Sequence, residues 1–296
     1  MSVIQKILNK IWGLGASLAN MAQRHKLLNS RARTVFRKLG HLLIPKPKER
    51  MTLSLPWKMK IITPPGFRGG RSYTAGVYEE DLTNLFKKII KQSDTVVDCG
   101  ALLGYYTLLA SSLAGPEGKV YSFEPEAKSC EYLKENIEIN KLKNVICVNK
   151  ALSEKTGFAQ FASSESKSIG TVGGFLSYDE NEENTNKIET VSFDDYFKKL
   201  NWPPVDFIKM DIDGAEKYAL LGMKQLSKKN SKLKMVMEVD HNAIKNSKSN
   251  PKELCDILMG LGFRKGFVVE KKLQEFSLKD GFLYLKSHYN VLLTKE

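Results

Sequence analysis

Cysteines are scarce in this sequence, and long apolar runs are missing from it. None of the four cysteines in the 296 residues forms a C-x-x-C pair. A protein of this size needs no disulfide scaffold, so we expect reduced and mostly buried thiols at Cys99, Cys130, Cys147 and Cys255. No unbroken apolar stretch reaches about 18 residues, so we expect no ordinary transmembrane helix. Residues 6–22 imitate a signal peptide only loosely, because glycines and polar residues interrupt them, and we expect a cytoplasmic protein.

Acidic residues are almost absent from the first 50 positions. Eleven lysines and arginines stand there against one acid, Glu49, which gives a net charge of +10. The remaining 246 residues carry 35 basic and 32 acidic side chains, a net charge of +3. An enzyme that acts on nucleic acid is expected to concentrate positive charge around its substrate cleft, so this distribution disfavours a nucleic-acid partner.

The basic segment has the pattern of an amphipathic helical extension over residues 1–48. Apolar residues recur at helical spacing, with lysines and arginines on the other face. One interpretation is docking on an anionic membrane or on a partner protein, which would make the protein peripherally membrane-associated. A second is plain packing on the core with a solvated basic face, and a third is tethering to RNA. We divide the chain into this extension, lead-in strands and a helix over 49–92, and a core over 93–296.

From Asp94 onward, strand and helix patterns alternate. Apolar runs predict strands over Thr95–Asp98, Lys119–Phe123, Val145–Val148, Val205–Met210 and Leu233–Val239. Helices are predicted over Asp81–Lys91, Tyr105–Ala114, Ala127–Asn140, Ala215–Leu226 and Pro251–Met259, and closing strands over Phe282–Leu285 and Tyr289–Thr294. Residues 157–192 suggest β-hairpins with a polar loop over 178–187. This alternation is typical of an α/β protein with a doubly wound, mainly parallel sheet.

The first predicted strand runs into a glycine turn. Gly100 and Gly104 frame it, and Asp98 stands two residues before the first glycine. Ligands of open α/β sheets bind at the carboxyl ends of the strands, and glycine lets the backbone approach them closely. The spacing G-x-x-x-G differs from the G-x-G-x-x-G of dinucleotide sites, which disfavours an NAD-dependent oxidoreductase. The carboxylate of Asp98 instead suits a ligand with positive charge.

The next two strand ends add to this turn. Glu124, followed by Pro125, ends the second strand 24 positions after Gly100, where a carboxylate can accept hydrogen bonds from ribose hydroxyls. The third strand leads to a loop containing Ala151, placed to read the edge of an adenine. Together these positions indicate a ligand that contains adenosine.

The fourth strand ends in a cluster of ionisable residues, Lys209, Asp211, Asp213 and Glu216, around a glycine. If the backbone stays extended, the first three share one side. Asp211 would then face both the ligand and a second substrate. Glu216 could instead simply complement a helix N-terminus. His241 follows the fifth strand, and we propose His241 or Asp211 as a general base. Two acids without further ligands are weak grounds for a metal, and we expect none.

The chain resembles the FkbM family of methyltransferases over residues 75–294. The landmarks occur in the family order: Gly76-Val-Tyr-Glu79, Asp98–Tyr105, Phe123-Glu124-Pro125, Asn149-Lys-Ala-Leu-Ser153, Ser192-Phe-Asp-Asp195 and Lys209–Glu216. The resemblance implies a Rossmann-like class I fold with a seven-stranded sheet, S-adenosylmethionine as cofactor, and O-methylation of a sugar, glycan, lipid-linked or natural-product hydroxyl. It implies an active-site role around Asp211 and cofactor contacts at Asp98, Gly100, Gly104 and Glu124. We also expect cofactor contacts at Ala101, Tyr105, Pro125, Ala151 and Asp211. The family often has Asn where this chain has Leu102, and Glu where it has Asp213.

Two rival functions stay open. Residues 134–140 are also similar to tRNA guanine methyltransferases, but the fourth strand does not end in an Asn-Pro-Pro-like motif for a flipped base. A non-catalytic membrane adaptor on a methyltransferase-like scaffold would bind membranes without binding a cofactor. Residues 157–187 are expected to shape the acceptor pocket, but they do not identify the acceptor.

Overall fold

The computed structural model describes residues 49–67, 70–75, 78–163, 174–177, 185–246, 249–282 and 288–295. The predicted extension over 1–48 lies outside these ranges, as do residues 178–184 of the predicted polar loop and 283–285 of a predicted closing strand. The chain divides into two compact units: Met1–Glu80 with Ile169–Thr171, and Asp81–Ser168 with Val172–Glu296. The three-part division by sequence stays a prediction.

The described part of the first unit is a small hairpin and a helix. Strands β1 (Met51–Ser54) and β2 (Lys60–Thr63) pair antiparallel, with Ser54 opposite Lys60. The turn between them closes through a hydrogen bond from the Leu55 N–H to the Met59 carbonyl at 2.7 Å. Helix α3 (Gly70–Ala75) follows. The short β-like runs predicted in this region are therefore confirmed.

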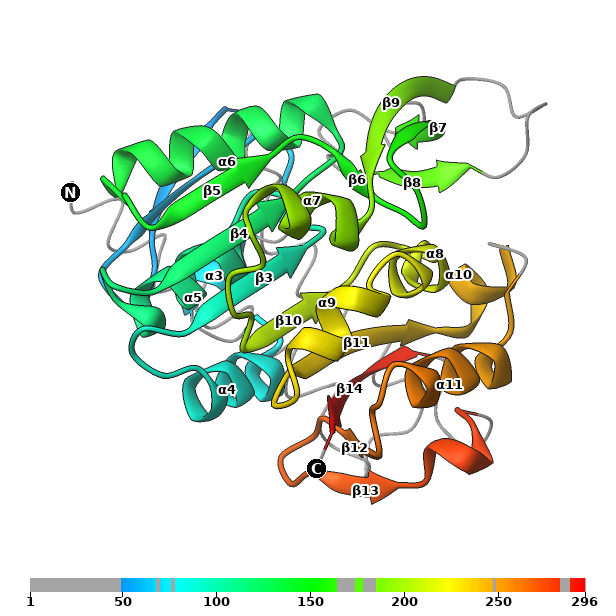
Figure 1. The fold of residues 1–296 in the computed structure, drawn as a ribbon. Coiled ribbons are helices and arrows are strands. Elements are labelled where there is room, and N and C mark those ends of the chain that lie inside the picture. The colour runs from blue at the N-terminus through cyan, green and yellow to red at the C-terminus, as the bar shows by residue number, and fades with distance from the viewer. Residues whose placement is uncertain are drawn as a thin grey trace, which may run out of the picture. The chain divides into compact units, whose positions relative to one another are not determined.

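The second unit is built on a large sheet (Figure 1). Its strands in chain order are β3 (Thr95–Cys99), β4 (Lys119–Phe123), β5 (Val145–Val148), β10 (Phe207–Met210), β11 (Lys234–Asp240), β12 (Lys265–Val268), β13 (Gln274–Phe276) and β14 (His288–Thr294). Across the sheet the order is β13-β12-β14-β11-β10-β3-β4-β5. The five strands from β11 to β5 are parallel, and the other three pair antiparallel. This confirms the Rossmann-like α/β fold; within the described ranges the sheet has one edge strand, β13, more than the seven predicted.

The order of the strands fixes where a ligand can bind. From β3 the chain moves outward through β4 to β5, and it then returns to place β10 on the other side of β3. The connections that leave β3 and β10 therefore diverge at their carboxyl ends. Such a switch point leaves a crevice between neighbouring strand ends, which is the usual ligand site of open α/β sheets.

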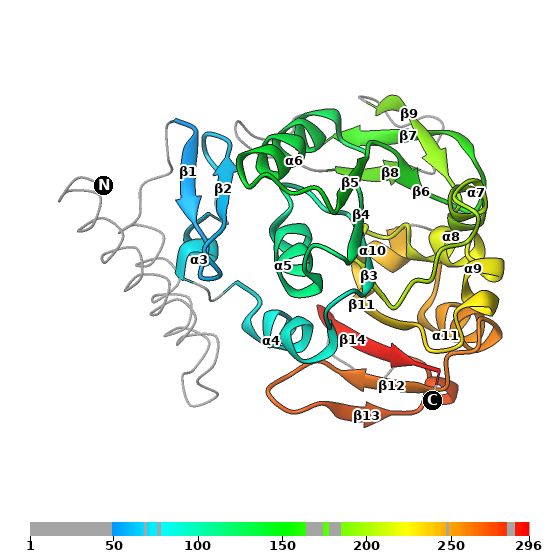
Figure 2. The ribbon, with the colours of Figure 1, turned by 60° about the vertical axis from the view of Figure 1, so that its left-hand side comes forward.

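Helices cover both faces of the sheet (Figure 2). On one face lie α4 (Glu80–Ile89), α5 (Tyr105–Ala114) and α6 (Ala127–Ile139); on the other lie α7 (Phe193–Lys199), α9 (Lys224–Lys229) and α11 (Pro251–Gly260). On the second face, Phe193, Leu226 and Leu258 pack with Met210 and Met237 in one buried cluster. Sequence periodicity did not reveal α7, although its Ser192 cap accepts a hydrogen bond from the Asp195 N–H at 3.0 Å.

The single helix predicted over Ala215–Leu226 is wrong. The chain forms α8 (Glu216–Leu221) and then α9, with Gly222 between them. A Cβ at Gly222 would lie 2.4 Å from the Ser153 carbonyl oxygen, so the backbone passes another segment too closely for a side chain. The carboxylate of Asp194 accepts hydrogen bonds from the Leu226 N–H at 2.8 Å and the Gln225 N–H at 2.9 Å. The first N–H groups of α9 are therefore bound by a carboxylate of α7.

A second sheet extends from the end of β5. It contains β6 (Ala151–Leu152), β7 (Gly157–Ser163), β8 (Gly174–Ser177) and β9 (Thr185–Val191), in the order β6-β9-β7-β8. The antiparallel pairs β7–β8 and β7–β9 confirm the hairpins predicted over 157–192. No helix in the described ranges is long and apolar enough to cross a bilayer.

Candidate active site

The glycine turn after β3 is built by two residues in the left-handed region. Gly100 has φ +75° and Gly104 has φ +92°. A Cβ at Gly100 would lie 1.9 Å from the Asp211 carbonyl oxygen, and one at Gly104 would lie 2.6 Å from the Cδ1 atom of Leu133. Both positions therefore need glycine, because the backbone conformation and the close approach each exclude a side chain. Gly100 brings the turn directly against the end of β10.

Glu124 lies beside this turn, as the sequence predicts. Its Oε2 accepts a hydrogen bond from the Leu102 N–H at 2.7 Å, and its Oε1 accepts one from the Glu126 N–H at 2.9 Å. The N–H groups of Gly100 and Ala101 each bond to the Phe123 carbonyl at 3.0 Å, which ties the turn to the end of β4. Burial raises the pKa of Glu124 to about 8, against the lowering effect of these two N–H donors.

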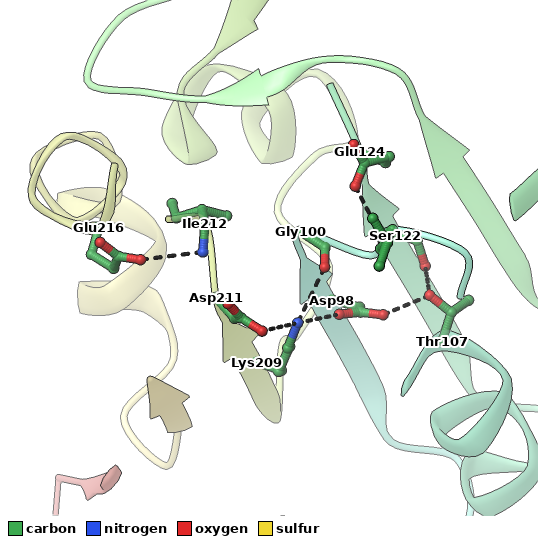
Figure 3. Close-up of polar contacts among 10 residues, drawn as sticks. Asp98, Gly100, Thr107, Ser122, Glu124, Lys209, Asp211, Ile212 and Glu216 are labelled. Carbon is green, nitrogen blue, oxygen red and sulfur yellow. Dashed lines mark hydrogen bonds and ion pairs between the residues drawn. The ribbon is translucent and has the colours of Figure 1, made fainter. Parts of the chain in front are cut away.

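A buried lysine joins the ends of β3 and β10 (Figure 3). The Lys209 Nζ lies 3.1 Å from the Asp211 carboxylate and 3.7 Å from that of Asp98, and it donates to the Gly100 carbonyl at 3.2 Å. Asp98 also accepts a hydrogen bond from the Thr107 hydroxyl at 2.6 Å. Burial raises the pKa of Asp98 above its usual range, and Lys209 and Thr107 partly offset this. The three groups form a network in which one cation serves two carboxylates.

The backbone after β10 turns instead of staying extended. Asp213 has φ +51° and Gly214 has φ +100°, so the assumption of an extended chain as far as Asp213 is wrong. A Cβ at Gly214 would lie 2.7 Å from the Ala243 carbonyl, which explains why glycine stands there. Glu216 is buried at the start of α8, and its Oε1 accepts a hydrogen bond from the Ile212 N–H at 3.2 Å. Burial raises the pKa of Glu216 to about 7. Glu216 therefore stabilises the turn.

The end of β11 adds two carboxylates and two histidines. The His288 Nε2 lies 3.2 Å from Glu238, and its Nδ1 lies 3.4 Å from Asp240. His241 is the first residue of α10 (His241–Asn246), and its ring lies 6.2 Å from the Tyr289 ring, centroid to centroid. The Nε2 of His241 is buried and has no hydrogen-bond partner in the described structure. A buried ring nitrogen without a partner is uncommon, and His241 therefore stays a candidate for the general base.

Three carboxylates of this rim could together hold a cation. Oxygens of Asp211, Asp213 and Glu238 lie within 4.8 Å of one another. Carboxylate oxygens are the ligands that divalent cations such as Mg²⁺ and Ca²⁺ prefer, although exposed acids also gather without a metal. The expectation that no metal is used stays a prediction.

The other predicted cofactor residues are spread around the same strand ends. Ala101 is buried in the glycine turn, and Ala151 is buried in β6 near Ala215. Pro125 receives a hydrogen bond on its carbonyl from the Asn149 amide at 3.1 Å. The Tyr105 hydroxyl lies 3.5 Å from the Thr83 hydroxyl on α4. The direct contacts of these four residues with a cofactor stay predictions.

Sequence reasoning missed part of the network. Thr107 stands on α5 and was assigned only to a helix, yet its hydroxyl holds Asp98 and lies 2.9 Å from the Ser122 hydroxyl. Lys209 was noticed in a cluster but given no role. A threonine in the first turn of the mostly apolar helix Tyr105–Ala114 is the signal that could have pointed to Thr107.

The strand ends fit S-adenosylmethionine in charge. The cofactor is cationic at its sulfonium and amino groups, and the ends of β3 and β10 supply two carboxylates against one lysine. One oxygen of Asp98, Oδ1, is buried, faces the Lys209 Nζ at 3.7 Å and accepts no hydrogen bond in the described structure. Gly100 lets the turn after β3 approach the Asp211 backbone closely, which brings Asp98 and Asp211 to one place. Asp98, Asp211 and Glu124 are the residues that would hold the cofactor.

Similarity to known proteins is consistent with this site. One curated relative is the hexuronic acid methyltransferase AglP of Haloferax volcanii, 26% identical over 145 residues, which are 49% of this chain and 56% of AglP. Another is the tRNA (adenine(58)-N(1))-methyltransferase catalytic subunit TRM61 of Yarrowia lipolytica, 33% identical over 107 residues, which are 36% of this chain and 23% of TRM61. The matches thus span less than two thirds of the length of either relative.

Solved structures and a family model match longer stretches. The S-adenosylmethionine-dependent O-methyltransferase of Thermotoga maritima superposes with a TM-score of 0.43 at 13% identity, over 85% of this chain and 94% of that one. The model of the methyltransferase FkbM domain matches residues 98–265, more than half of the chain and the whole rim from Asp98 to His241. The protein therefore belongs to the FkbM methyltransferase family, whose members depend on S-adenosylmethionine.

Proposed function

We propose that the protein transfers a methyl group from S-adenosylmethionine to a hydroxyl oxygen of a sugar, glycan, lipid-linked or natural-product acceptor. The observation that carries the proposal is the contact of the Glu124 carboxylate with the glycine turn through the Leu102 N–H at 2.7 Å. This contact ties the glycine turn after β3 to the end of β4. A carboxylate and a glycine turn so placed can receive the ribose and the methionine part of one adenosyl cofactor.

Each side chain has a separate task in this proposal. Glu124 accepts hydrogen bonds from the ribose hydroxyls. Asp98 and Asp211 present negative charge to the cationic part of the cofactor. Lys209 pairs with both carboxylates and so offsets the repulsion between them. S-adenosylmethionine supplies the methyl group. Holding the acceptor oxygen in line with that group can lower the barrier by about 7–11 kcal/mol in ideal cases.

A base is needed because an alcohol is a poor nucleophile until its proton leaves. Asp211 is partly exposed at the rim, and His241 has a ring nitrogen without a partner in the described structure. Either can take the proton while the acceptor oxygen gains the methyl group. Asp211→Asn and His241→Gln distinguish the two when turnover is measured at saturating S-adenosylmethionine, because Asp211 also faces the cofactor. Loss of turnover under this condition identifies the base, and two fully active variants would defeat the assignment.

The acceptor class is supported by one relative. AglP is named as a methyltransferase of hexuronic acid, a sugar that offers hydroxyl groups, and its match covers 49% of this chain. Calorimetry with S-adenosylmethionine and S-adenosylhomocysteine tests the cofactor site first. Mass spectrometry of glycan and lipid fractions from cells with and without the gene then seeks a methyl group that disappears with the protein. Folded protein that binds neither adenosyl compound would refute the function.

RNA methylation is the second candidate, and the match to the catalytic subunit TRM61 favours it. The carboxylates at the ends of β10 and β11 would repel the phosphates of RNA, and residues 51–296 have a net charge of only +3. Binding of RNA by residues 51–296 that weakens steeply with added salt would decide for this candidate. Binding that needs residues 1–50 would point to tethering by the extension alone.

Residues 1–50 are proposed to dock on an anionic membrane or on a partner protein. The support is their net charge of +10 beside helically spaced apolar residues. Flotation with vesicles that contain anionic lipid, compared between the full chain and residues 51–296, tests the membrane. Equal flotation of both would remove the reason for this proposal. Vesicle binding without any cofactor binding would instead favour the non-catalytic adaptor.

A further inference from the structure

Two cysteines outside the proposed chemistry face one another across α6 and β5. The Sγ atoms of Cys130 on α6 and Cys147 on β5 are 3.1 Å apart. A disulfide brings two sulfurs to about 2.05 Å, so an approach of about 1 Å would join them. Cys130 is buried, whereas Cys147 is partly exposed and gives a small oxidant a path to the pair. The sulfurs are therefore placed for a bond that the reduced protein lacks.

The pair lies directly behind the carboxylate proposed to bind ribose. The carboxylate of Glu126 caps α6 by accepting from the Ser129 N–H at 2.6 Å, and the Glu126 N–H donates to Glu124. On the other side, the Glu124 N–H bonds to the Val148 carbonyl at 3.0 Å, one residue after Cys147. Glu124 is thus held by the first turn of α6 and by the end of β5, the two elements that the sulfurs would join.

We propose that Cys130 and Cys147 are a modification site, which a peroxide converts into a disulfide, and that this link weakens adenosyl cofactor binding at Glu124. The inference about binding rests on the proposed function; the chemistry of the thiols does not. Sites of this kind tolerate little displacement, because an error of 1 Å can cost on the order of a hundredfold in a catalytic geometry. A covalent pull between α6 and β5 moves both supports of Glu124.

The reaction balances with peroxide alone. The hydrogen bond between the sulfurs lowers the pKa of Cys130 and raises that of Cys147, so the thiolate resides on Cys130. This thiolate attacks one peroxide oxygen; the S–O bond forms, the O–O bond breaks and hydroxide leaves. The Cys147 sulfur then attacks the sulfenic sulfur, the S–S bond forms, and the oxygen departs as water with the proton of the Cys147 thiol.

The other two cysteines provide internal controls. Cys99 on β3 and Cys255 on α11 are both buried. Burial raises the pKa of Cys255 to about 12 and that of Cys99 well above its usual range. Neither thiol is expected to react, since the thiolate is the reactive form. Oxidation of the specific pair would therefore modify only the peptides of Cys130 and Cys147. General oxidation would also modify the peptides of Cys99 and Cys255.

The experiment treats the full chain with hydrogen peroxide and locates the modification by peptide mass spectrometry. We expect a linked peptide that joins Cys130 to Cys147, with Cys99 and Cys255 still free to alkylation. Affinity for S-adenosylhomocysteine, measured by calorimetry, should fall roughly tenfold and return after treatment with a reductant. Cys147→Ala should keep its affinity under peroxide, and the matched variant Cys255→Ala should lose it as the parent does.

The outcomes separate the two proposals. Absence of the linked peptide, or a link that leaves the affinity unchanged, would overturn this inference. If the reduced parent does not bind S-adenosylhomocysteine at all, the proposed function fails instead, while the peptide result still reports on the pair. The peptide measurement needs no variant, so a substitution that does not fold leaves the test intact.

Discussion

The two sides of the strand-end rim hold their polar groups by different means. On the adenosyl side, at the ends of β3 and β4, both oxygens of Glu124 are fixed by backbone N–H groups. On the proposed acceptor side, which we assign to the ends of β10 and β11, Glu238 and Asp240 share the imidazole of His288, and Asp211 pairs with Lys209. Backbone donors keep one geometry, whereas side chains can be exchanged without altering the fold. The adenosyl side is therefore set by the fold, and the acceptor side by the choice of residues.

The largest effect is expected where the two sides touch, at Gly100→Ala. The new Cβ would lie 1.9 Å from the Asp211 backbone oxygen, in a conformation with φ +75°. Relief requires β3 and β10 to separate, which goes beyond ordinary overpacking, so we expect a loss of about 5 kcal/mol or more in unfolding free energy. Binding of S-adenosylhomocysteine should vanish.

Urea unfolding and calorimetry measure both effects of Gly100→Ala. Gly157→Ala is the matched control, since a Cβ there meets nothing within 4 Å, and it should cost little. A stable Gly100→Ala protein with normal binding would show that the two sides are not pressed together at this turn.

The next effect concerns the cation that joins both sides. Lys209→Met leaves the carboxylates of Asp98 and Asp211 without their lysine, and the Lys209 side chain is only 5% exposed. Breaking a buried pair costs about 3–5 kcal/mol, and we expect about 3 because Asp211 is partly exposed. Urea unfolding at neutral pH measures the loss.

The control for Lys209→Met is Lys150→Met. Lys150 pairs with Glu189 at the surface, where an ion pair contributes about 0–1 kcal/mol. Equal losses in the two variants would mean that Lys209 does no more than a surface lysine, and that the two sides are independent.

A smaller effect, confined to the adenosyl side, is expected for Glu124→Gln. The amide cannot accept at both positions as the carboxyl group does, so affinity for S-adenosylhomocysteine should fall roughly tenfold. Because burial raises the pKa of Glu124 to about 8, its contribution to stability is complete below the usual pKa of a glutamate. That contribution is lost as the pH rises through about 8.

Unfolding of the empty protein at pH 6 and pH 9 tests this sign. The parent should lose about 2–3 kcal/mol more than Glu124→Gln between the two values, because each pH unit below a pKa of about 8 corresponds to about 1.4 kcal/mol. Glu154→Gln, a change at an exposed glutamate, should follow the parent. A parent that loses no more stability than Glu124→Gln between pH 6 and pH 9 would mean that Glu124 is ionised in the folded protein well below neutral pH.

The adenosyl side was predictable because its signals are local in sequence. Gly100, Gly104 and Glu124 follow directly from strands whose bounds the apolar runs predicted closely; Lys119–Phe123 and Val145–Val148 match β4 and β5. Strand order in a doubly wound sheet then places Glu124 beside Gly100. No further information was needed to bring these residues together.

The sequence placed Asp211 and His241 on the acceptor side, but the contacts of that side escaped prediction because they are distant in sequence. His288 meets Asp240 across 48 residues, and nothing in either segment indicates the pairing. Asp213 departs from the extended form through a local φ of +51°, which apolar periodicity does not register. The break at Gly222 likewise depends on the Ser153 carbonyl and on Asp194, which belong to other elements.

The smallest expected effect refines the adenosyl side itself, at the position where the family often has Asn and this chain has Leu102. Leu102 has φ +50°, the left-handed region that costs most residues about 1–2 kcal/mol and that Asn tolerates better. Its side chain is only partly buried, so little packing is lost. Leu102→Asn should therefore raise the unfolding free energy by about 0.5–1 kcal/mol, with the Leu102 N–H bond to Glu124 kept. Urea unfolding measures the gain, and Leu103→Asn, at a fully buried neighbour, should instead be strongly destabilising. A loss of stability in Leu102→Asn would show that the contacts of the leucine side chain contribute more than its left-handed backbone costs. The adenosyl side would then also depend on which residue stands at a position, and not on the fold alone.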